Sequence, residues 1–319
     1  MIHAEILTMC KEFGIPQNAE FNFKTFTVDT NYLPKQRVDG KLMNFEGMPR
    51  CNFKYKQIAN QGQYGLIQRV LRYSNYSIIP IQVAIKRPRN PALSLESEAF
   101  LQGIIYRCLE RRGIHGAVPA VHDIFLFADE VRFSMDWIEG ISCRDFFYAQ
   151  IQKEPAQFEE IFLNSLIQLC FILTVLEEEL SFDHRDLNLD NIWVRKLSHP
   201  KKYKFQNYTI SFSHQLVLLD FGFACMGLNS KLPIGLGHGI IPEFDPCPKD
   251  GRDIYHILND FINTSVFSKA VSATLLETMK SWMLPYRVHN AHLTHLITSD
   301  IHFNNMNLTP SAILKWFFN

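Results

Sequence analysis

Two acidic side chains and one amide stand at a spacing that could support phosphoryl transfer from ATP. The stretch FDHRDLNLDN at 182–191 contains Asp186 and, five residues later, Asn191. A second acid, Asp220, begins the tripeptide Asp-Phe-Gly. In this chemistry an acidic side chain orients the attacking hydroxyl and accepts its proton, while Asp and Asn oxygens hold the Mg²⁺ ions that bridge the phosphates. We therefore expect Asp186 to be the base and Asn191 and Asp220 to bind Mg²⁺.

These two segments together resemble the catalytic loop and the metal-binding tripeptide of the eukaryotic-type protein kinase superfamily. The resemblance covers about residues 52–319. It implies an α+β, two-lobed fold, with a small β-rich N-lobe at 52–139 and a larger helical C-lobe at 140–319. Residues 1–51 would form an N-terminal extension. The same resemblance implies ATP and Mg²⁺ as cofactors.

A glycine-containing segment between two predicted strands resembles the kinase loop that covers the phosphates. Gly62 and Gly65 match the second and third glycines of that loop, and Asn60 replaces the first. Small, flexible residues are needed there because backbone N–H groups approach the phosphates closely. Asn can stand in, since it tolerates a left-handed backbone better than most residues. The resemblance also implies that Ile67 and Ala84 contact the adenine ring.

A Val-Ala-Ile-Lys tetrapeptide ends at Lys86 and resembles the third strand of a kinase N-lobe. Lys86 would bridge the α- and β-phosphates and pair with a Glu on the next helix. We prefer Glu98 as this partner, because the longer connection from Lys86 reaches more easily. Glu96 is the alternative. In kinases the residue four positions after this Glu is part of an apolar spine, and from Glu96 that residue is Phe100. From Glu98 that position is Gln102.

The run at 133–140, which ends in a glycine, resembles the kinase hinge. Met135 would lie behind the adenine, and the backbones of Asp136 and Ile138 would hydrogen-bond its edge. Without the flanking motifs, the same run is equally typical of a buried strand that ends at a Gly turn.

The catalytic loop also bears on the substrate. Arg185 favours a protein substrate, because kinases of the aminoglycoside and choline type usually carry a small residue there. Asn188 stands where serine/threonine kinases usually have Lys. Residues other than Lys occur at this position in divergent kinases, such as the haspin-like group and some viral kinases. Asn188 can donate a hydrogen bond to the γ-phosphate, but the choice between Ser/Thr and Tyr stays open. A serine/threonine protein kinase is our prediction; a small-molecule kinase and a non-catalytic nucleotide-binding scaffold are the alternatives.

Three further expectations concern the C-terminal half. Between 223 and 243 the only hydroxyl side chain is Ser230, and Ile-Pro-Glu at 241–243 is the nearest match to the Ala-Pro-Glu landmark. We therefore expect constitutive activity, or control by the N-terminal extension. Asp253 should hydrogen-bond the backbone of the catalytic loop. Residues 196–214 should form an insertion at the surface.

Composition narrows the class of protein. The 32 basic and 32 acidic side chains balance, which gives no sign of a nucleic-acid or membrane partner. Seven scattered Cys favour a reduced, intracellular protein. The N-terminus lacks a signal-peptide pattern, and the apolar stretch at 161–176 looks too short and interrupted to span a bilayer. We expect a soluble cytoplasmic or nuclear protein. Three His at 289, 292 and 295 lack a matching acid or Cys for a metal site.

Overall fold

The computed structural model describes residues 2–61, 65–75, 77–89, 95–205, 208–227, 233–235, 245–286 and 293–318. Within these ranges the chain is α+β, as expected. It divides into two units, of which the first contains residues 1–107 and 118–138 and the second contains 108–117 and 139–319. The first 51 residues thus belong to the same unit as the strands that follow them.

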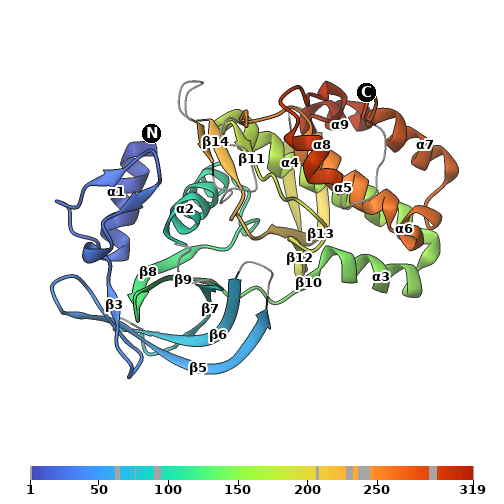
Figure 1. Cartoon of the computed structure of the whole chain (residues 1–319). Coiled ribbons are helices and arrows are strands. Elements are labelled where there is room, and N and C mark those ends of the chain that lie inside the picture. Colours follow the sequence, from blue (N-terminus) through green and yellow to red (C-terminus); the bar gives the residue numbers. More distant parts are fainter. Residues whose placement is uncertain are drawn as a thin grey trace. The chain divides into compact units, whose positions relative to one another are not determined.

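The first unit contains a closed β-barrel (Figure 1), with the strand order β3-β4-β5-β6-β7-β9-β8. The strands are β3 (Lys35–Gln36), β4 (Lys41–Met43), β5 (Pro49–Gln61), β6 (Gly65–Ser74), β7 (Ile81–Pro88), β8 (Val121–Phe127) and β9 (Glu130–Asp136). Neighbouring strands are antiparallel except for β3 and β8. The sequence pattern predicted the five longer strands. It missed β3 and β4, because two or three residues are too few to show an alternation.

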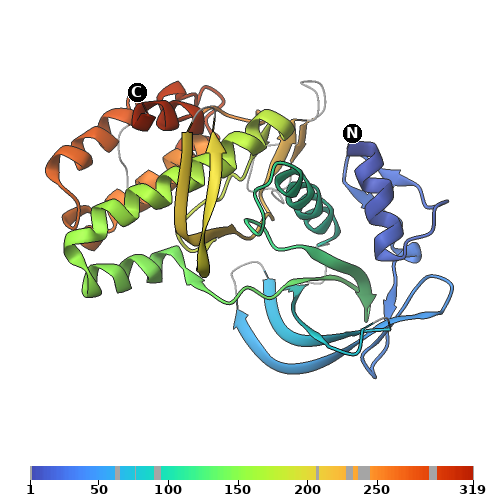
Figure 2. The ribbon, with the colours of Figure 1, turned by 180° about the vertical axis from the view of Figure 1, so that it is seen from behind.

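The N-terminal helix of the chain packs against helix α2 (Glu96–Arg111), as Figures 1 and 2 both show. Helix α1 (Ile2–Phe13) presents its buried face, including Met9, so closely that a Cβ on Gly103 would lie 2.3 Å from the Met9 Cε atom. Its last residue packs edge-on against Phe100, and Arg107 forms ion pairs with two acids of α1. The segment after α1 contains β1 (Phe21–Asn22), β2 (Thr27–Val28) and η1 (Thr30–Tyr32). The N-terminal segment therefore fixes the position of α2 within this unit.

Helix α4 (Phe158–Leu180) runs through the second unit, and most of its side chains are buried. The described residues of this unit also form the helices α3 (Cys143–Lys153), η2 (Pro155–Gln157), α5 (Arg252–Asn263), α6 (Ser265–Lys269), α7 (Ala273–Trp282), α8 (Thr294–Ser299), η4 (Met306–Leu308) and α9 (Pro310–Phe318).

The helical stretch Pro155–Leu180 is long and apolar enough to cross a membrane, which corrects the expectation that it is too short. However, 67% of its most apolar window is buried inside the protein. A core helix passes the same test of length and composition, so this is weak evidence for a membrane span. Burial against the rest of the unit accounts for the apolar composition.

Two small sheets lie beside α4. One consists of β10 (Ile141–Ser142), β12 (Ile192–Phe205) and β13 (Tyr208–Leu218), and the other of β11 (Phe182–Asp183), β14 (Cys225–Gly227) and β15 (Pro233–Gly235). The insertion expected at 196–214 continues the hairpin of β12 and β13 (Figure 2). The side chains of Tyr203 and Phe212 in this hairpin are buried. Gln168 of α4 donates a hydrogen bond to the His214 carbonyl. The hairpin is therefore packed onto the helix and is not a loose surface loop.

A disulfide joins Cys225 of β14 to Cys247. The expectation that all cysteines are reduced is wrong for this pair. Of the free thiols, Cys51 and Cys143 are buried, and burial raises their pKa well above the ordinary value, to about 12 for Cys51. These buried thiols are inert packing groups.

Candidate functional site

Asp186 and Asn191 meet within one turn of the loop that follows β11. The Asn191 Nδ2 atom donates to the Asp186 carbonyl at 2.8 Å and to its Oδ2 atom at 3.1 Å. The contact is local in sequence, so the loop sequence by itself nearly dictates it. Among the described residues, no hydrogen bond reaches the Oδ1 atom of Asn191. This side chain therefore orients the carboxylate and keeps one oxygen for another partner.

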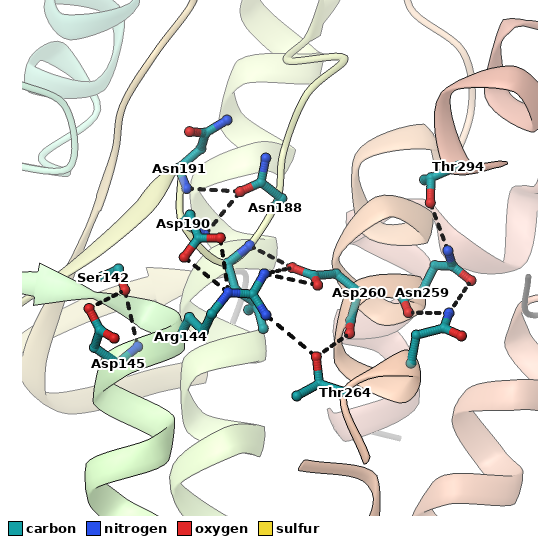
Figure 3. A network of polar contacts seen from close by, with 12 residues as sticks. Ser142, Arg144, Asp145, Asn188, Asp190, Asn191, Asn259, Asp260, Thr264 and Thr294 are labelled. Carbon is teal, nitrogen blue, oxygen red and sulfur yellow. Dashed lines mark hydrogen bonds and ion pairs between the residues drawn. The ribbon is translucent and has the colours of Figure 1, made fainter. Parts of the chain in front are cut away.

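The side chain of Asn188 stabilises the same turn by hydrogen bonds to its backbone. Its Oδ1 atom accepts hydrogen bonds from the backbone N–H groups of Asp190 and Asn191, at 2.9 and 3.1 Å (Figure 3). Its Nδ2 atom donates to the Asp186 carbonyl at 3.2 Å and lies 3.5 Å from the Asp186 Oδ1 atom. Asn commonly stabilises turns in this way. Its contact with a γ-phosphate remains a prediction.

Arg144 ties this loop to the helices behind it (Figure 3). Its Nε atom donates to both carboxylate oxygens of Asp190 at 3.0 and 2.9 Å, and its Nη2 atom donates to both oxygens of Asp260 at the same distances. Asp260 also accepts the backbone N–H of Leu189 at 3.0 Å. Paired charge-assisted bonds of this kind fix geometry as well as adding energy. The loop is thereby anchored to α3 and α5.

Asp253 holds the start of the loop at 182–191. Its two carboxylate oxygens accept the backbone N–H groups of His184 and Arg185, at 2.8 and 3.0 Å. This prediction from the sequence is confirmed. Arg185 has a positive φ of 67°, a conformation that costs free energy for a residue with a side chain and needs surrounding contacts to hold it. Burial raises the pKa of the Asp253 carboxyl.

The side chain of Arg185 is buried and reaches Asp245. The Arg185 Nη2 atom lies 3.2 Å from the Asp245 Oδ2 atom, and Arg252 Nη1 lies 2.7 Å from the same oxygen. Lys249 forms a third ion pair with Asp245. The Arg185 guanidinium is therefore already paired with a carboxylate of the chain itself.

A backbone hydrogen bond from the residue before Asp220 places Asp220 beside the loop that contains Asn191. The N–H of Leu219, the residue before it, donates to the Asn191 carbonyl at 2.9 Å. Asp220 has a positive φ of 61°, and the next residue, Phe221, is fully buried with its ring 5.2 Å from that of His184. The His184 Nε2 atom donates to the Leu219 carbonyl at 3.0 Å. The two residues predicted to bind Mg²⁺ therefore come from adjoining pieces of backbone.

The donor set fits Mg²⁺ in chemical type. Magnesium prefers hard oxygen ligands and usually takes only one or two from the protein, with water and phosphate oxygens completing the shell. The Asp220 carboxylate and the amide oxygen of Asn191 are such ligands. Within the described part of the chain, no group of three or more His, Cys, Asp or Glu side chains is placed to hold a metal ion.

In the first unit, Lys86 pairs with Glu98. The Lys86 Nζ atom lies 2.5 Å from the Glu98 Oε1 atom, and both side chains are buried. Glu96, the alternative partner, instead accepts the backbone N–H of Val28, and burial raises its pKa to about 7. A buried pair of charges costs solvation free energy, so removing one partner leaves the other strongly disfavoured.

The position one turn after Glu98, where the resemblance to kinases favoured an apolar residue, is taken by the polar Gln102. Gln102 is buried, and its Nε2 atom donates to the Pro119 carbonyl at 2.9 Å and lies 3.5 Å from the Met135 sulfur. The residue predicted to lie behind the adenine thus contacts α2. Ala84 is buried on β7 and is the register partner of Met135.

The remaining predicted ATP contacts are only partly described. Asn60 lies in β5 opposite Ile67 of β6, and Gly65 is the first residue of β6. Gly62 lies outside the described residues. Asp136 ends β9 and donates its backbone N–H to the Ala120 carbonyl at 3.0 Å. Ile138 is the last residue of the first unit.

Sequence reasoning missed residues that contact the loop at 182–191, among them Arg144, Asp245, Asp260 and His295. His295 contacts Asp186 directly, and the sequence had suggested only a scattered histidine. None of these residues belongs to a recognised motif, and each reaches the loop from a distant part of the chain. Comparison with protein-family models and with curated proteins finds no match to this chain.

Proposed function

We propose that this protein is an ATP-dependent protein kinase that transfers the γ-phosphate to Ser or Thr hydroxyls of protein substrates. The observation that carries the proposal is the geometry of the catalytic loop, where Asn191 orients the Asp186 carboxylate and Asp253 holds the loop backbone. The buried pair of Lys86 and Glu98 supports it independently. On this proposal the first unit is a kinase N-lobe and the second a kinase C-lobe.

Each residue then has a defined role. Lys86, held by Glu98, binds the α- and β-phosphates, and Asp186 orients the acceptor hydroxyl and takes its proton. Asn191 and Asp220 hold Mg²⁺, which, when bound, neutralises charge on the phosphates. The residues that would contact the rest of ATP are Asn60, Gly62, Gly65, Ile67, Ala84, Asp136 and Ile138.

The substrate class follows from Arg185 and its surroundings. The resemblance of the His-Arg-Asp tripeptide to protein kinases favours a protein acceptor. The pairing of Arg185 with Asp245 supports activity without phosphorylation of the intervening segment. The packing of the N-terminal segment on α2 also keeps Glu98 beside Lys86. We keep the cytoplasm or nucleus as the proposed location, although a disulfide such as Cys225–Cys247 is unusual there.

The test is transfer of labelled γ-phosphate from ATP with Mg²⁺ to a mixed protein extract and to the enzyme itself. Asp220→Asn should abolish transfer, because it removes a metal ligand, while the exposed Asp129→Asn should not. Label on Ser or Thr that disappears only in Asp220→Asn supports the proposal, and label on Tyr would change its specificity.

If protein stays unlabelled while Mg²⁺ and ATP together raise the melting temperature, the acceptor is a small molecule or the chain is a nucleotide-binding scaffold. A small-molecule kinase would still turn ATP over when metabolite mixtures are added. A protein with no thermal response to Mg²⁺ and ATP would contradict ATP binding altogether.

A further inference from the structure

His295 contacts the carboxylate that we assign as the base. Its Nε2 atom lies 3.1 Å from the Asp186 Oδ1 atom, although the two residues are 109 positions apart. A carboxylate accepts hydrogen bonds, so the Nε2–H group is the donor. The Asp186 side chain is 16% exposed and that of His295 is 48% exposed. The pair therefore lies at the surface of the second unit, where a substrate can reach it.

The imidazole ring is held in place by its neighbours. It packs edge-on against the ring of His256, at 5.0 Å between centroids, and lies 6.4 Å from the ring of Phe223. His256 is buried in α5 and its Nε2 atom bonds the Thr298 hydroxyl of α8 at 2.9 Å. Burial lowers the pKa of His256 well below its ordinary value, so this neighbour is neutral. The contacts from α5 thus fix the helix that carries His295.

The carboxylate of Asp186 needs more than one donor to keep a single orientation. The terminal torsion of an Asp side chain is broad and roughly two-fold. Asn191 donates to Oδ2 at 3.1 Å, while Asn188 lies 3.5 Å from Oδ1, at the outer limit of a hydrogen bond. His295 is the closer donor to Oδ1. With one donor on each oxygen, every carboxylate oxygen still has a lone pair for the acceptor hydroxyl.

We propose that His295 is a positioning residue for Asp186, which it holds by the Nε2 hydrogen bond in the orientation that receives the proton of the acceptor hydroxyl. This inference rests on the proposed kinase function. It gives α8, outside all recognised motifs, a part in the phosphoryl-transfer step.

The test compares His295→Leu and His295→Gln with wild type, and uses Leu296→Ala as the matched control, since Leu296 is the next residue of α8 and is exposed. His295→Leu should lower kcat by roughly tenfold, a fraction of what a positioned base contributes. The KM for ATP should not change. Gln can place an amide N–H where Nε2–H stood, so His295→Gln should recover most of kcat. Leu296→Ala should match wild type.

Two outcomes would overturn the inference. One is a His295→Leu variant with wild-type or higher kcat, which would mean that the contact is dispensable or blocks the base. The other is a His295→Gln variant as slow as His295→Leu at the same melting temperature, which would point to packing instead of the hydrogen bond.

A spectroscopic readout separates this inference from the proposed function. In ¹⁵N spectra of the imidazoles, Nε2 of His295 should carry the proton, and its resonance should shift in Asp186→Asn. If wild type transfers no phosphate, the proposed function fails and the catalytic role of His295 fails with it, whatever the spectrum shows. If wild type is active but the His295 resonance does not respond to Asp186→Asn, only the positioning inference fails.

Discussion

Arg185 and Asp245 form a buried ion pair, with 3.2 Å between the Arg185 Nη2 and Asp245 Oδ2 atoms and side chains only 5% and 1% exposed. The pair joins the strained start of the catalytic loop to a segment 60 residues further along the chain. Asp245 also neutralises Lys249 and Arg252. Three cations therefore share one carboxylate, and the loop at 182–191 is tied to this cluster through Arg185.

Asp245→Asn should destabilise the protein strongly. The substitution leaves three buried cations without this counter-charge, and breaking a buried ion pair by removing one partner costs about 3–5 kcal/mol. Urea unfolding would measure the loss. Asp129→Asn, an exposed turn residue, serves as the control. A loss within about 0.5 kcal/mol, the range of ordinary surface substitutions, would show that the cluster is not buried as described.

Activity should not require phosphorylation of residues 223–243. Arg185 already has an anionic partner in Asp245, so it needs no phosphate to hold it. Protein treated with a phosphatase should transfer phosphate as fast as untreated protein, and Ser230→Ala should be active. Loss of activity after phosphatase treatment, restored by phosphate on this segment, would contradict the prediction.

Glu98→Gln and Glu96→Gln should act differently although the residues are two positions apart. Glu98→Gln removes the charge that holds Lys86, so on the proposed function phosphate transfer should fall roughly 10- to 100-fold, the loss typical of disturbed substrate positioning. Glu96→Gln weakens a bond to the Val28 backbone and should change thermal stability more than kcat. Equal kcat losses in the two variants would show that the pairing of Lys86 is not selective.

Glu177→Gln should reduce the dependence of stability on pH. Burial, followed by the nearby Asp253 and Asp183 carboxylates, raises the pKa of Glu177 to about 9 from 4.5. The folded protein thus keeps a proton that the unfolded chain releases. The stabilisation is complete below about pH 4.5 and is lost as pH rises toward 9, at up to about 1.4 kcal/mol per pH unit.

Urea unfolding at several pH values would test this, with the neighbouring, exposed Glu178→Gln as control. Glu177→Gln should be less sensitive to pH than wild type and more stable than it at alkaline pH. Parallel stability curves for Glu177→Gln and wild type would rule out the raised pKa.

Cys247→Ala should lower stability, because it removes the cross-link to Cys225. A disulfide that closes a loop of this size typically stabilises by about 2–4 kcal/mol. Digestion without reductant should yield a peptide containing both cysteines. Reductant should lower the melting temperature of wild type and of Cys10→Ala, but not that of Cys247→Ala. The disulfide would be contradicted if reductant left the melting temperature of wild type unchanged and the digest contained no peptide that links the two cysteines.

Local patterns in the sequence were enough for the five longer barrel strands, for α2 and α4, and for the order of the motifs. Asp186 and Asn191 meet within one loop, so their spacing nearly determines their contact. Lys86 and the two candidate Glu residues are also near one another in sequence. Even there the sequence could not choose between Glu98 and Glu96. Two positions on a helix point about 200° apart, and only the packing of the helix decides which of the two faces Lys86.

Only the tertiary structure decided the contacts between distant segments. Asp245 and His295 reach the catalytic loop, Cys247 reaches Cys225, and the N-terminal segment reaches α2. The short strands β3 and β4 also form only because neighbours in the barrel pair with them. Such contacts leave no periodic or motif signal, since each depends on where the whole chain has folded and not on the residues beside it. The sequence by itself therefore identified Asp186 as the candidate base, while the distant residues that hold its loop came only from the tertiary structure.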